Sequence, residues 1–317
     1  MDRPVLSRVR AATRAARAVR TVTGAEEKEN DVAGMTTVLG GEPLALADAV
    51  GEELRGAAPL GVAYSGGVDS ALLLALAVRT LGAGNVVALL GVSPSLARSE
   101  RARAHETAAF IGARVVEIET HEGENPDYVR NGVDRCFFCK DELFTRISDE
   151  VVAAHGLAAV AYGENADDAR RPDRPGSRAA TNHRVLRPLS VVGMTKAQVR
   201  LVARALGLPV ADKPAAPCLA SRIPHGEEVT PEKLRQVERA EEVLRELGFS
   251  DGRVRHHGDI ARIELPTAEI ARAGEEEIRT ALDAGVRAAG FRYVVVDLRG
   301  IQSGAFTLPL LAVGHRG

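Results

Sequence analysis

The sequence predicts an α/β protein with a parallel, doubly wound sheet, followed by a small C-terminal α+β domain. Between about residues 41 and 222, short apolar strands alternate with helices, which is the pattern of a parallel sheet covered by helices on both faces. Beyond residue 250 the order changes to two strands separated by Gly258-Asp259, then a helix and a last strand, which is typical of a mixed α+β unit.

We therefore expect a sheet domain over residues 41–222 and a domain for substrate binding and oligomerisation over 223–317. Residues 1–40 are rich in Arg and Ala and contain few large apolar side chains, so a dispensable, disordered extension is expected there. A start at Met35 would fit this interpretation, and the alternatives are a transit-like segment or a basic arm that binds nucleic acid.

Periodicity and capping residues predict the individual elements. Ser99 and Thr195 are expected to cap helices, and Thr230-Pro231 to open the long helix of the second domain. Residues 170–178, which are crowded with Arg, Pro and Gly, predict a loop. The expected strands are 60–64, 86–92, 114–118, 158–162, 253–257, 260–265 and 291–298, and the expected helices end at 54, 81, 111, 154, 207, 247 and 289.

The sharpest signal is the turn Ser65-Gly66-Gly67-Val68-Asp69-Ser70 between the first strand and its helix. The glycines let backbone N–H groups close on an anion, and the following helix points its positive end at the same place. Ser65 and Ser70 add hydroxyls, and Asp69 can orient backbone amides or hold Mg²⁺. No lysine follows the glycines, unlike in the GxxxxGK[ST] loop.

This block resembles the pyrophosphate loop (PP-loop) of the ATP pyrophosphatase superfamily. The resemblance implies an adenine nucleotide alpha hydrolase-like fold, ATP with Mg²⁺ as ligand, and cleavage between the α- and β-phosphates. Two other strand ends should lie at the same edge of a parallel sheet. Gly91 and Ser93 end the second strand and are expected near adenosine, and Asn165 and Asp168 follow the fourth strand and are expected to face substrate.

Composition argues against several classes of protein. A net charge of −2 disfavours a strongly electrostatic nucleic-acid binder, and the absence of Trp with 3% aromatic residues leaves few platforms for base stacking. No apolar run is long enough to span a membrane. The 3 cysteines cannot all pair within one chain, so a cytoplasmic protein with reduced thiols is expected.

The cysteines fall in two places, Cys136-x-x-Cys139 and Cys218. A redox pair would have no use for Cys218, and zinc would need a fourth ligand such as His183 or His225. Three thiolates can instead hold a [4Fe–4S] cluster and leave one iron open to a small ligand. Three unrelated buried thiols are the alternative without function.

The blocks SGGVDS, RCFFCK, GENADD and PCLASR, in this order, resemble the LarE-type sulfur transferases over about residues 45–300. The resemblance implies that the enzyme adenylates a carboxylate of pyridinium-3,5-biscarboxylic acid mononucleotide and inserts sulfur, on the route to the nickel-pincer nucleotide of lactate racemase. In one branch of the family the cysteine matching Cys218 gives up its sulfur and becomes dehydroalanine. In the branch that this sequence resembles more closely, Cys136, Cys139 and Cys218 would hold a [4Fe–4S] cluster that carries hydrosulfide.

A renewable donor would need sulfide or a cysteine-derived sulfur source as a partner. The resemblance also places Glu241 and Glu264 where family members have acids linked to a metal at a subunit interface, so a homo-oligomer is expected, although ordinary charged faces explain these residues equally well. The phosphate of a nucleotide-like acid would suit four residues whose side chains match phosphate oxygens, with solvated surface groups as the alternative: Ser221, Arg222, Arg253 and Arg255.

The leading hypothesis is therefore ATP-dependent sulfur transfer to a small nucleotide-like acid, with AMP and pyrophosphate as products and Cys218 as the catalytic residue. A tRNA thiolation enzyme is the nearest alternative, and it would need a broad basic face. An ammonia-using amide synthetase would have no evident use for the cysteines. A non-enzymatic nucleotide-binding module would bind ATP without releasing pyrophosphate.

Overall fold

The computed structural model describes residues 19–21, 34–35, 38–170 and 175–302. The chain forms two compact units, each with its own sheet. Unit 1 contains residues 1–93, 98–121 and 137–216, and unit 2 contains residues 94–97, 122–136 and 217–317.

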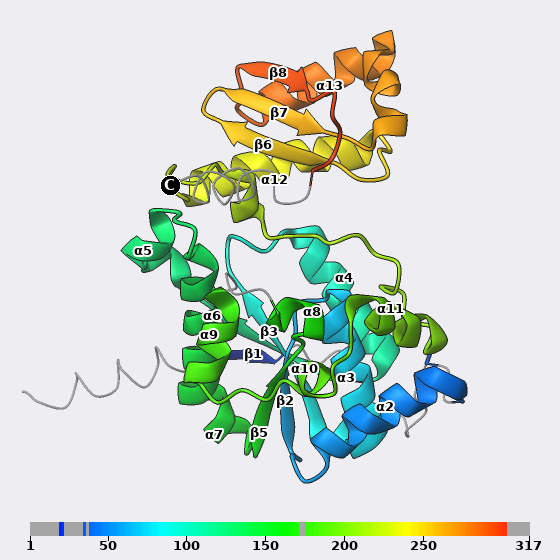
Figure 1. Ribbon diagram of the computed structural model, residues 1–317. Helices are drawn as coiled ribbons and strands as arrows, with labels where there is room; N and C mark the ends of the chain where they lie inside the picture. The colour runs from blue at the N-terminus through cyan, green and yellow to red at the C-terminus, as the bar shows by residue number, and fades with distance from the viewer. Residues whose placement is uncertain (1–18, 22–33, 36–37, 171–174, 303–317) are drawn as a thin grey trace, which may run out of the picture. The chain divides into compact units, whose positions relative to one another are not determined.

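Unit 1 is built on a five-stranded sheet with the strand order β1-β4-β3-β2-β5. Strands β1, β2, β3 and β5 of this sheet are labelled in Figure 1. Strands β2 to β5 run parallel, as the sequence predicts, and β1 adds an antiparallel edge strand beside β4 that was not among the predicted strands. The strands are β1 (Val19–Thr21), β2 (Leu60–Ala63), β3 (Val86–Val92), β4 (Arg114–Glu119) and β5 (Ala159–Tyr162).

Helices cover both faces of this sheet. On one face α3 packs against β2 and β3 and against α2, α4 and α11, and its residues 71–77 have no exposed surface. On the other face α6, the π-helical turn at Ile147–Val151 and α9 cover a core that includes Leu89, Val116 and Phe144. The helices are α2 (Gly41–Leu54), α3 (Val68–Leu81), α4 (Arg98–Ile111), α6 (Arg135–Arg146), α7 (Val152–His155), α8 (Ala166–Ala169), α9 (Pro175–Asn182), α10 (Pro188–Val191) and α11 (Lys196–Ala205).

Unit 2 packs the long helix α12 and the helix α13 on a three-stranded sheet. Strands β6 and β7 form the predicted antiparallel hairpin through Gly258-Asp259, and β8 pairs in parallel with β7. Its elements are α5 (Pro126–Val129), the 3₁₀ turn η4 (Leu219–Arg222), α12 (Pro231–Glu246), β6 (Arg253–His257), β7 (Ile260–Glu264), α13 (Glu276–Ala288) and β8 (Tyr293–Val296).

Several predicted boundaries differ from the structure. Helix α4 begins at Arg98, so Ser99 lies inside the helix and is not its cap. Helix α6 begins at Arg135 rather than at Lys140, so both cysteines of the CxxC block are helical. Residues 175–178 belong to α9 rather than to a loop, and residues 171–174 of that prediction lie outside the described residues.

The predicted caps of two other helices are confirmed. Thr195 forms a capping box with Gln198 at the start of α11, and the Thr230 hydroxyl accepts the backbone N–H of Lys233 in α12 at 3.3 Å. None of the helices in the described residues has both the length and the apolar character needed to cross a bilayer.

Candidate functional site

The predicted nucleotide loop connects β2 to α3 in unit 1. Gly66 has a φ of +70°, and a Cβ added there would lie 2.9 Å from the Cβ of Ala104, so the turn requires glycine at this position. The Ser70 hydroxyl accepts the backbone N–H of Ser65 at 3.2 Å and donates to the carbonyl of Gly67 at 3.0 Å. The loop is thereby folded back on the positive N-terminal end of a buried helix, where an anion is stabilised.

Asp69, in the first turn of α3, is held from both sides. Its Oδ1 accepts Nδ2 of Asn165 at 2.9 Å, and its Oδ2 accepts Nζ of Lys196 at 2.5 Å. Asn165 is 1% exposed and caps α8, where its side chain also bonds Asp168. The structure therefore brings Asn165 and Asp168 to the nucleotide loop, as neighbours of Asp69.

The end of β5 lies against the start of α3. A Cβ added to Gly163 would lie 2.8 Å from the backbone nitrogen of Ser70 and 2.9 Å from the carbonyl carbon of Asp69. Since both contacts are backbone atoms, only glycine allows this approach. Gly91 and Ser93, both half-buried, lie at the same edge, because Ala63 of β2 pairs with Leu89 of β3 and Gly91 follows two residues later.

Cys218 lies in unit 2, directly before the turn η4. The backbone around it is fixed, since Leu219 N donates to the carbonyl of Ser95 at 2.9 Å and Ser221 N donates to the carbonyl of Cys218 at 2.9 Å. Cys136 and Cys218 are exposed, Cys139 is half-buried, and none of the three forms a disulfide. Cys136 and Cys139 are three residues apart on α6, which places them on one side of the helix.

Asn131 and Arg135 join the two cysteine-bearing segments of unit 2. Asn131 has no exposed surface and a φ of 58°, and its Nδ2 donates to the carbonyls of Ile223, Pro224 and Glu227 at 3.2, 2.8 and 3.0 Å. Arg135 donates from Nη1 to Oδ1 of Asn131 at 2.5 Å and to the carbonyl of Ala220 at 2.8 Å. These bonds fix the segment that leads to Cys136 against the segment that follows Cys218.

Two opposite effects act on the pKa of the Cys218 thiol. Protein atoms around the sulfur desolvate it and raise its pKa, although the residue as a whole is exposed, and the charges of Arg135 and Arg222 favour the thiolate. A thiolate is the form that attacks an electrophile or binds a metal, whereas the net effect of the surroundings is a raised pKa, which favours the neutral Cys218 thiol.

No three His, Cys, Asp or Glu side chains within the described ranges are gathered closely enough to hold a metal ion. Both histidines considered as zinc ligands form hydrogen bonds, His183 with Asp141 at 3.0 Å and His225 with the carbonyl of Asn131 at 3.0 Å. Cys136, Cys139 and Cys218 are therefore not gathered as a metal site in the part of the chain that the structure describes, and the [4Fe–4S] cluster stays a prediction.

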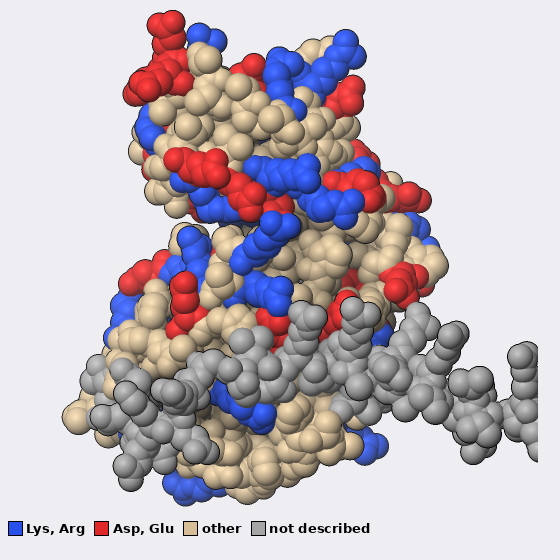
Figure 2. Space-filling view, turned by 180° about the vertical axis from the view of Figure 1, so that it is seen from behind, with Lys and Arg blue, Asp and Glu red and all other residues tan. Residues whose placement is uncertain are grey.

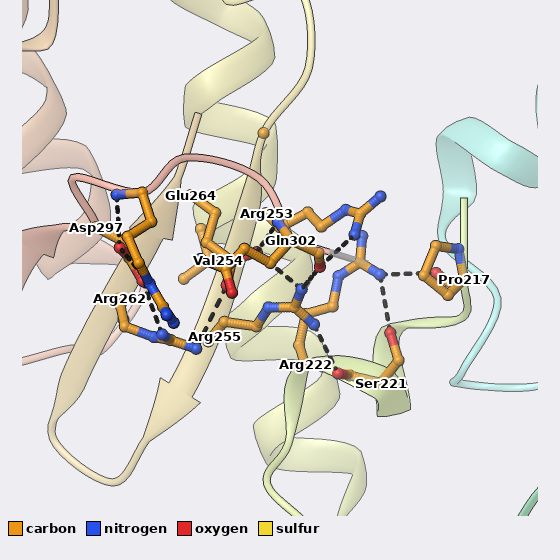
Figure 3. A network of polar contacts seen from close by, with 12 residues as sticks. Pro217, Ser221, Arg222, Arg253, Val254, Arg255, Arg262, Glu264, Asp297 and Gln302 are labelled. Carbon is orange, nitrogen blue, oxygen red and sulfur yellow. Dashed lines mark hydrogen bonds and ion pairs between the residues drawn. The ribbon is translucent and has the colours of Figure 1, made fainter. Parts of the chain in front are cut away.

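Unit 2 also carries a cluster of arginines and carboxylates between η4 and the hairpin (Figure 3). Arg222 donates from Nε to Glu241 at 2.8 Å and from Nη1 to the Ser221 hydroxyl at 2.9 Å. Arg255 donates to Oε2 of Glu264 at 2.8 Å and to the carbonyl of Ser221 at 3.0 Å. The structure thus brings Ser221 together with Arg222 and Arg255 through these bonds.

The electrostatic balance of this cluster is positive. Arg253 donates to the carbonyl of Gln302 at 3.1 Å, and its pKa is lowered by burial and further by the neighbouring charges of Arg222 and Arg255. Such a field favours a bound anion. Glu241 and Glu264 are 6% and 0% exposed and pair with arginines of the same chain.

Three similarities relate this chain to known proteins. The asparagine synthase family matches residues 44–185, a span that contains the nucleotide loop but not Cys218. A protein of Synechocystis sp. described as uncharacterized is 44% identical over 243 residues, which cover 77% of this chain and 90% of that protein. Pyridinium-3,5-bisthiocarboxylic acid mononucleotide synthase of Lactiplantibacillus plantarum is 36% identical over 245 residues, which cover 77% of this chain and 87% of that protein.

The sequence analysis missed Lys196, Asn131 and Arg135. Lys196 is 127 positions from Asp69, and no local pattern joins the two, although a lysine at the first position of a capped helix is a visible anomaly. Asn131 looks like an ordinary loop residue before Gly132. Only the folded chain shows that it reaches residues more than 90 positions away.

We predict that Gly163→Ala forces the end of β5 away from the start of α3. Overpacking against backbone should cost about 1–3 kcal/mol of folding free energy and weaken ATP binding, because the loop must shift. Denaturant unfolding and ATP calorimetry would measure both effects. Gly84→Ala is the control, since a Cβ there meets no atom within 4 Å, and equal behaviour of the two variants would contradict the prediction.

We also predict that Asn131→Ala loosens the segment around Cys218. Three carbonyls and Arg135 would lose their partner in a buried place, at a cost of about 1–3 kcal/mol, and maleimide should then modify Cys218 faster. Asn131→Gly separates the lost amide from the strain of a positive φ. The prediction would be wrong if both variants had the same unfolding free energy as the parent protein and the same rate of maleimide modification at Cys218.

Proposed function

Because the chain belongs to the family that includes pyridinium-3,5-bisthiocarboxylic acid mononucleotide synthase, we propose that it is an ATP-dependent sulfurtransferase that acts on a carboxylate of pyridinium-3,5-biscarboxylic acid mononucleotide. The product would be a precursor of a nickel-pincer nucleotide. The proposal rests on one observation: this chain of the family contains both a loop for ATP and the Cys218 thiol, which is acted on by the charges of the buried Arg135 and Arg222.

The first step is adenylation at the loop of unit 1. A carboxylate oxygen of the substrate attacks the α-phosphorus of ATP, the bond to the β-phosphate oxygen breaks, and pyrophosphate leaves with the electron pair. Backbone N–H groups of Ser65–Ser70 and the N-terminal end of α3 would bind the phosphates. Oxygen atoms of Asp69 and Asp168 are of the type that Mg²⁺ prefers, so a magnesium ion that arrives with ATP would find suitable ligands there.

The second step is attack on the acyl-adenylate. If Cys218 is the donor, its thiolate forms a thioester and AMP leaves with the electron pair of the broken bond. Removal of the Cα proton of Cys218 then expels the sulfur from Cβ, which leaves a thiocarboxylate on the product and dehydroalanine in the chain. Alternatively, Cys136, Cys139 and Cys218 would hold a [4Fe–4S] cluster, whose chemistry would be the supply of sulfide-level sulfur in place of the Cys218 thiol, with sulfide or a cysteine-derived source as the partner.

The arginine cluster would hold the substrate phosphate. Arg253, Arg255 and Arg222 with Ser221 have buried charges and a positive balance, which suits a substrate with one phosphate and two carboxylates. On the face shown in Figure 2, basic side chains of the described residues alternate with acidic ones, so the visible part of this face does not form the broad basic surface that a tRNA substrate would need. We further propose a cytoplasmic homo-oligomer.

We expect Cys218→Ala to abolish thiocarboxylate formation while pyrophosphate release continues at a rate within about a factor of two of the parent protein, since the loop is unchanged. Mass spectrometry of the product and a pyrophosphate assay would measure the two steps. An unchanged yield of product would refute the assignment, and an ammonia-dependent amide product would indicate an amide synthetase.

Cys136→Ala and Cys139→Ala distinguish the two sulfur sources. If Cys218 is consumed, both variants should still make one product per chain, and the protein should lose the mass of one H₂S. If a cluster is the donor, both variants should be inactive and the anaerobically purified parent protein should contain iron and sulfide. A parent protein that binds ATP and releases no pyrophosphate with substrate would be a binding module.

A further inference from the structure

After β8 the chain turns back against the hairpin of unit 2, in a return segment of residues 297–302. Its path is set by Gly300, which has a φ of +73°. A Cβ added there would lie 2.9 Å from the carbonyl oxygen of Leu265 and 2.8 Å from a side-chain carbon of Thr267. The N–H of Ile301 then donates to the carbonyl of Leu265 at 3.0 Å. Only glycine therefore lets the return segment lie this close to the residues that follow β7.

The return segment ends on two buried arginines of the candidate phosphate site. The carbonyl of Gln302 accepts Nη1 of Arg253 at 3.1 Å and Nη2 of Arg255 at 2.9 Å (Figure 3). The N–H of Gln302 donates to Oε2 of Glu264 at 3.4 Å, and the same oxygen accepts Nη2 of Arg255. Two guanidinium groups thus converge on one oxygen atom of the main chain.

A carbonyl is a poorer partner for two guanidinium groups than a phosphate. A phosphate carries negative charge on several oxygens, and its pairs with arginine are frequently bidentate, which adds energy and directional fit. The Gln302 carbonyl offers one oxygen and no net charge. An oxygen of a phosphate bound to both Arg253 and Arg255 would take the position that this carbonyl holds.

The return segment is attached less firmly than the hairpin that it covers. Leu298 is 82% exposed, and Ile301 and Gln302 are half-buried, whereas Arg253 and Arg255 are 5% and 3% exposed. A segment that buries little apolar surface opens at a low cost in free energy while the elements beneath it stay folded. The return segment can therefore leave the arginines without unfolding of unit 2.

We propose that the return segment is an autoinhibitory contact, in which the carbonyl of Gln302 occupies Arg253 and Arg255 until a substrate phosphate displaces it. This inference rests on the proposed function, which assigns the phosphate of the substrate to these arginines. Displacement exchanges hydrogen bonds and includes no covalent step. The apparent affinity for phosphate then equals the intrinsic affinity multiplied by the fraction of molecules whose arginines are uncovered.

The first test is Gly300→Ala in the full chain, with Gly258→Ala as the matched control. Gly258 also has a positive φ, 62°, and lies in the turn of the same sheet, but a Cβ added there meets no atom within 4 Å. Gly300→Ala should push the return segment off the arginines and tighten binding of inorganic phosphate and of pyridinium-3,5-biscarboxylic acid mononucleotide by about 3- to 10-fold. Gly258→Ala should bind both ligands like the parent protein. Calorimetry would measure the affinities, and ATP, whose proposed site is in unit 1, should bind all three proteins equally.

Two truncated chains should change the affinity in opposite directions. A chain that ends at Gly300 lacks the Gln302 carbonyl and should bind phosphate more tightly, as Gly300→Ala does. A chain that ends at Gln302 has a carboxylate in place of this carbonyl, and its charge should hold both arginines more firmly and weaken phosphate binding by about 3- to 10-fold. Both chains lack residues 303–317, which lie outside the described residues, so the difference between them reports residues 301–302. Thermal unfolding without ligand would show whether the stability differs, and the truncated pair decides the question if Gly300→Ala does not fold.

Phosphate affinities within about twofold of the parent value in Gly300→Ala and in both truncated chains would overturn the inference. Weaker phosphate binding by a Gly300→Ala protein of unchanged stability would also overturn it, because the return segment would then be part of the binding site. If the parent protein bound neither phosphate nor the mononucleotide, the inference and the proposed function would both fail. If the affinities changed as expected but the parent protein transferred no sulfur, the proposed function alone would fail.

Discussion

The arrangement of the nucleotide end of unit 1 depends on the carboxylate of Asp69. It lies in the first turn of α3 and bonds Asn165 at the start of α8 and Lys196 at the start of α11. One side chain therefore joins the N-terminal ends of three helices that are far apart in the sequence. Charge-assisted hydrogen bonds of this kind are short and directional, so they restrain the loop. Its two ends are also fixed, because the loop connects β2 to the buried helix α3.

Unit 2 contains buried arginines whose charges need carboxylate partners. Arg222 and Arg255 are almost fully buried, and each would destabilise the fold without a carboxylate partner. Glu241 and Glu264 fill this need, and Glu241 also accepts the backbone N–H of Val254 at 3.0 Å, which links α12 to β6. The same contacts that compensate the buried charges of the two arginines also fix the orientation of their guanidinium groups.

Much of the fold could be predicted because its signals are local. The strand, glycine turn and apolar helix around Ser65–Ser70 are consecutive in sequence, and the structure contains them as predicted. The caps at Thr195 and Thr230 were predicted for the same reason. The start of α6 was not predicted, because Arg135 is fixed by hydrogen bonds to Asn131 and to the carbonyl of Ala220. Ala220 lies 85 positions away from Arg135 in the sequence.

The sequence by itself determined the fold class and the nucleotide loop, and it identified the three cysteines as candidate site residues. These features are set by periodicity, glycine turns and residue types, which act over a few neighbouring positions. The tertiary structure alone decided which distant side chains complete each site. Lys196 is joined to Asp69 across 127 positions, and Asn131 to Glu227 across 96. Such pairs arise from packing of whole elements, and the energy of a buried charge or amide depends on partners that no short stretch of sequence contains.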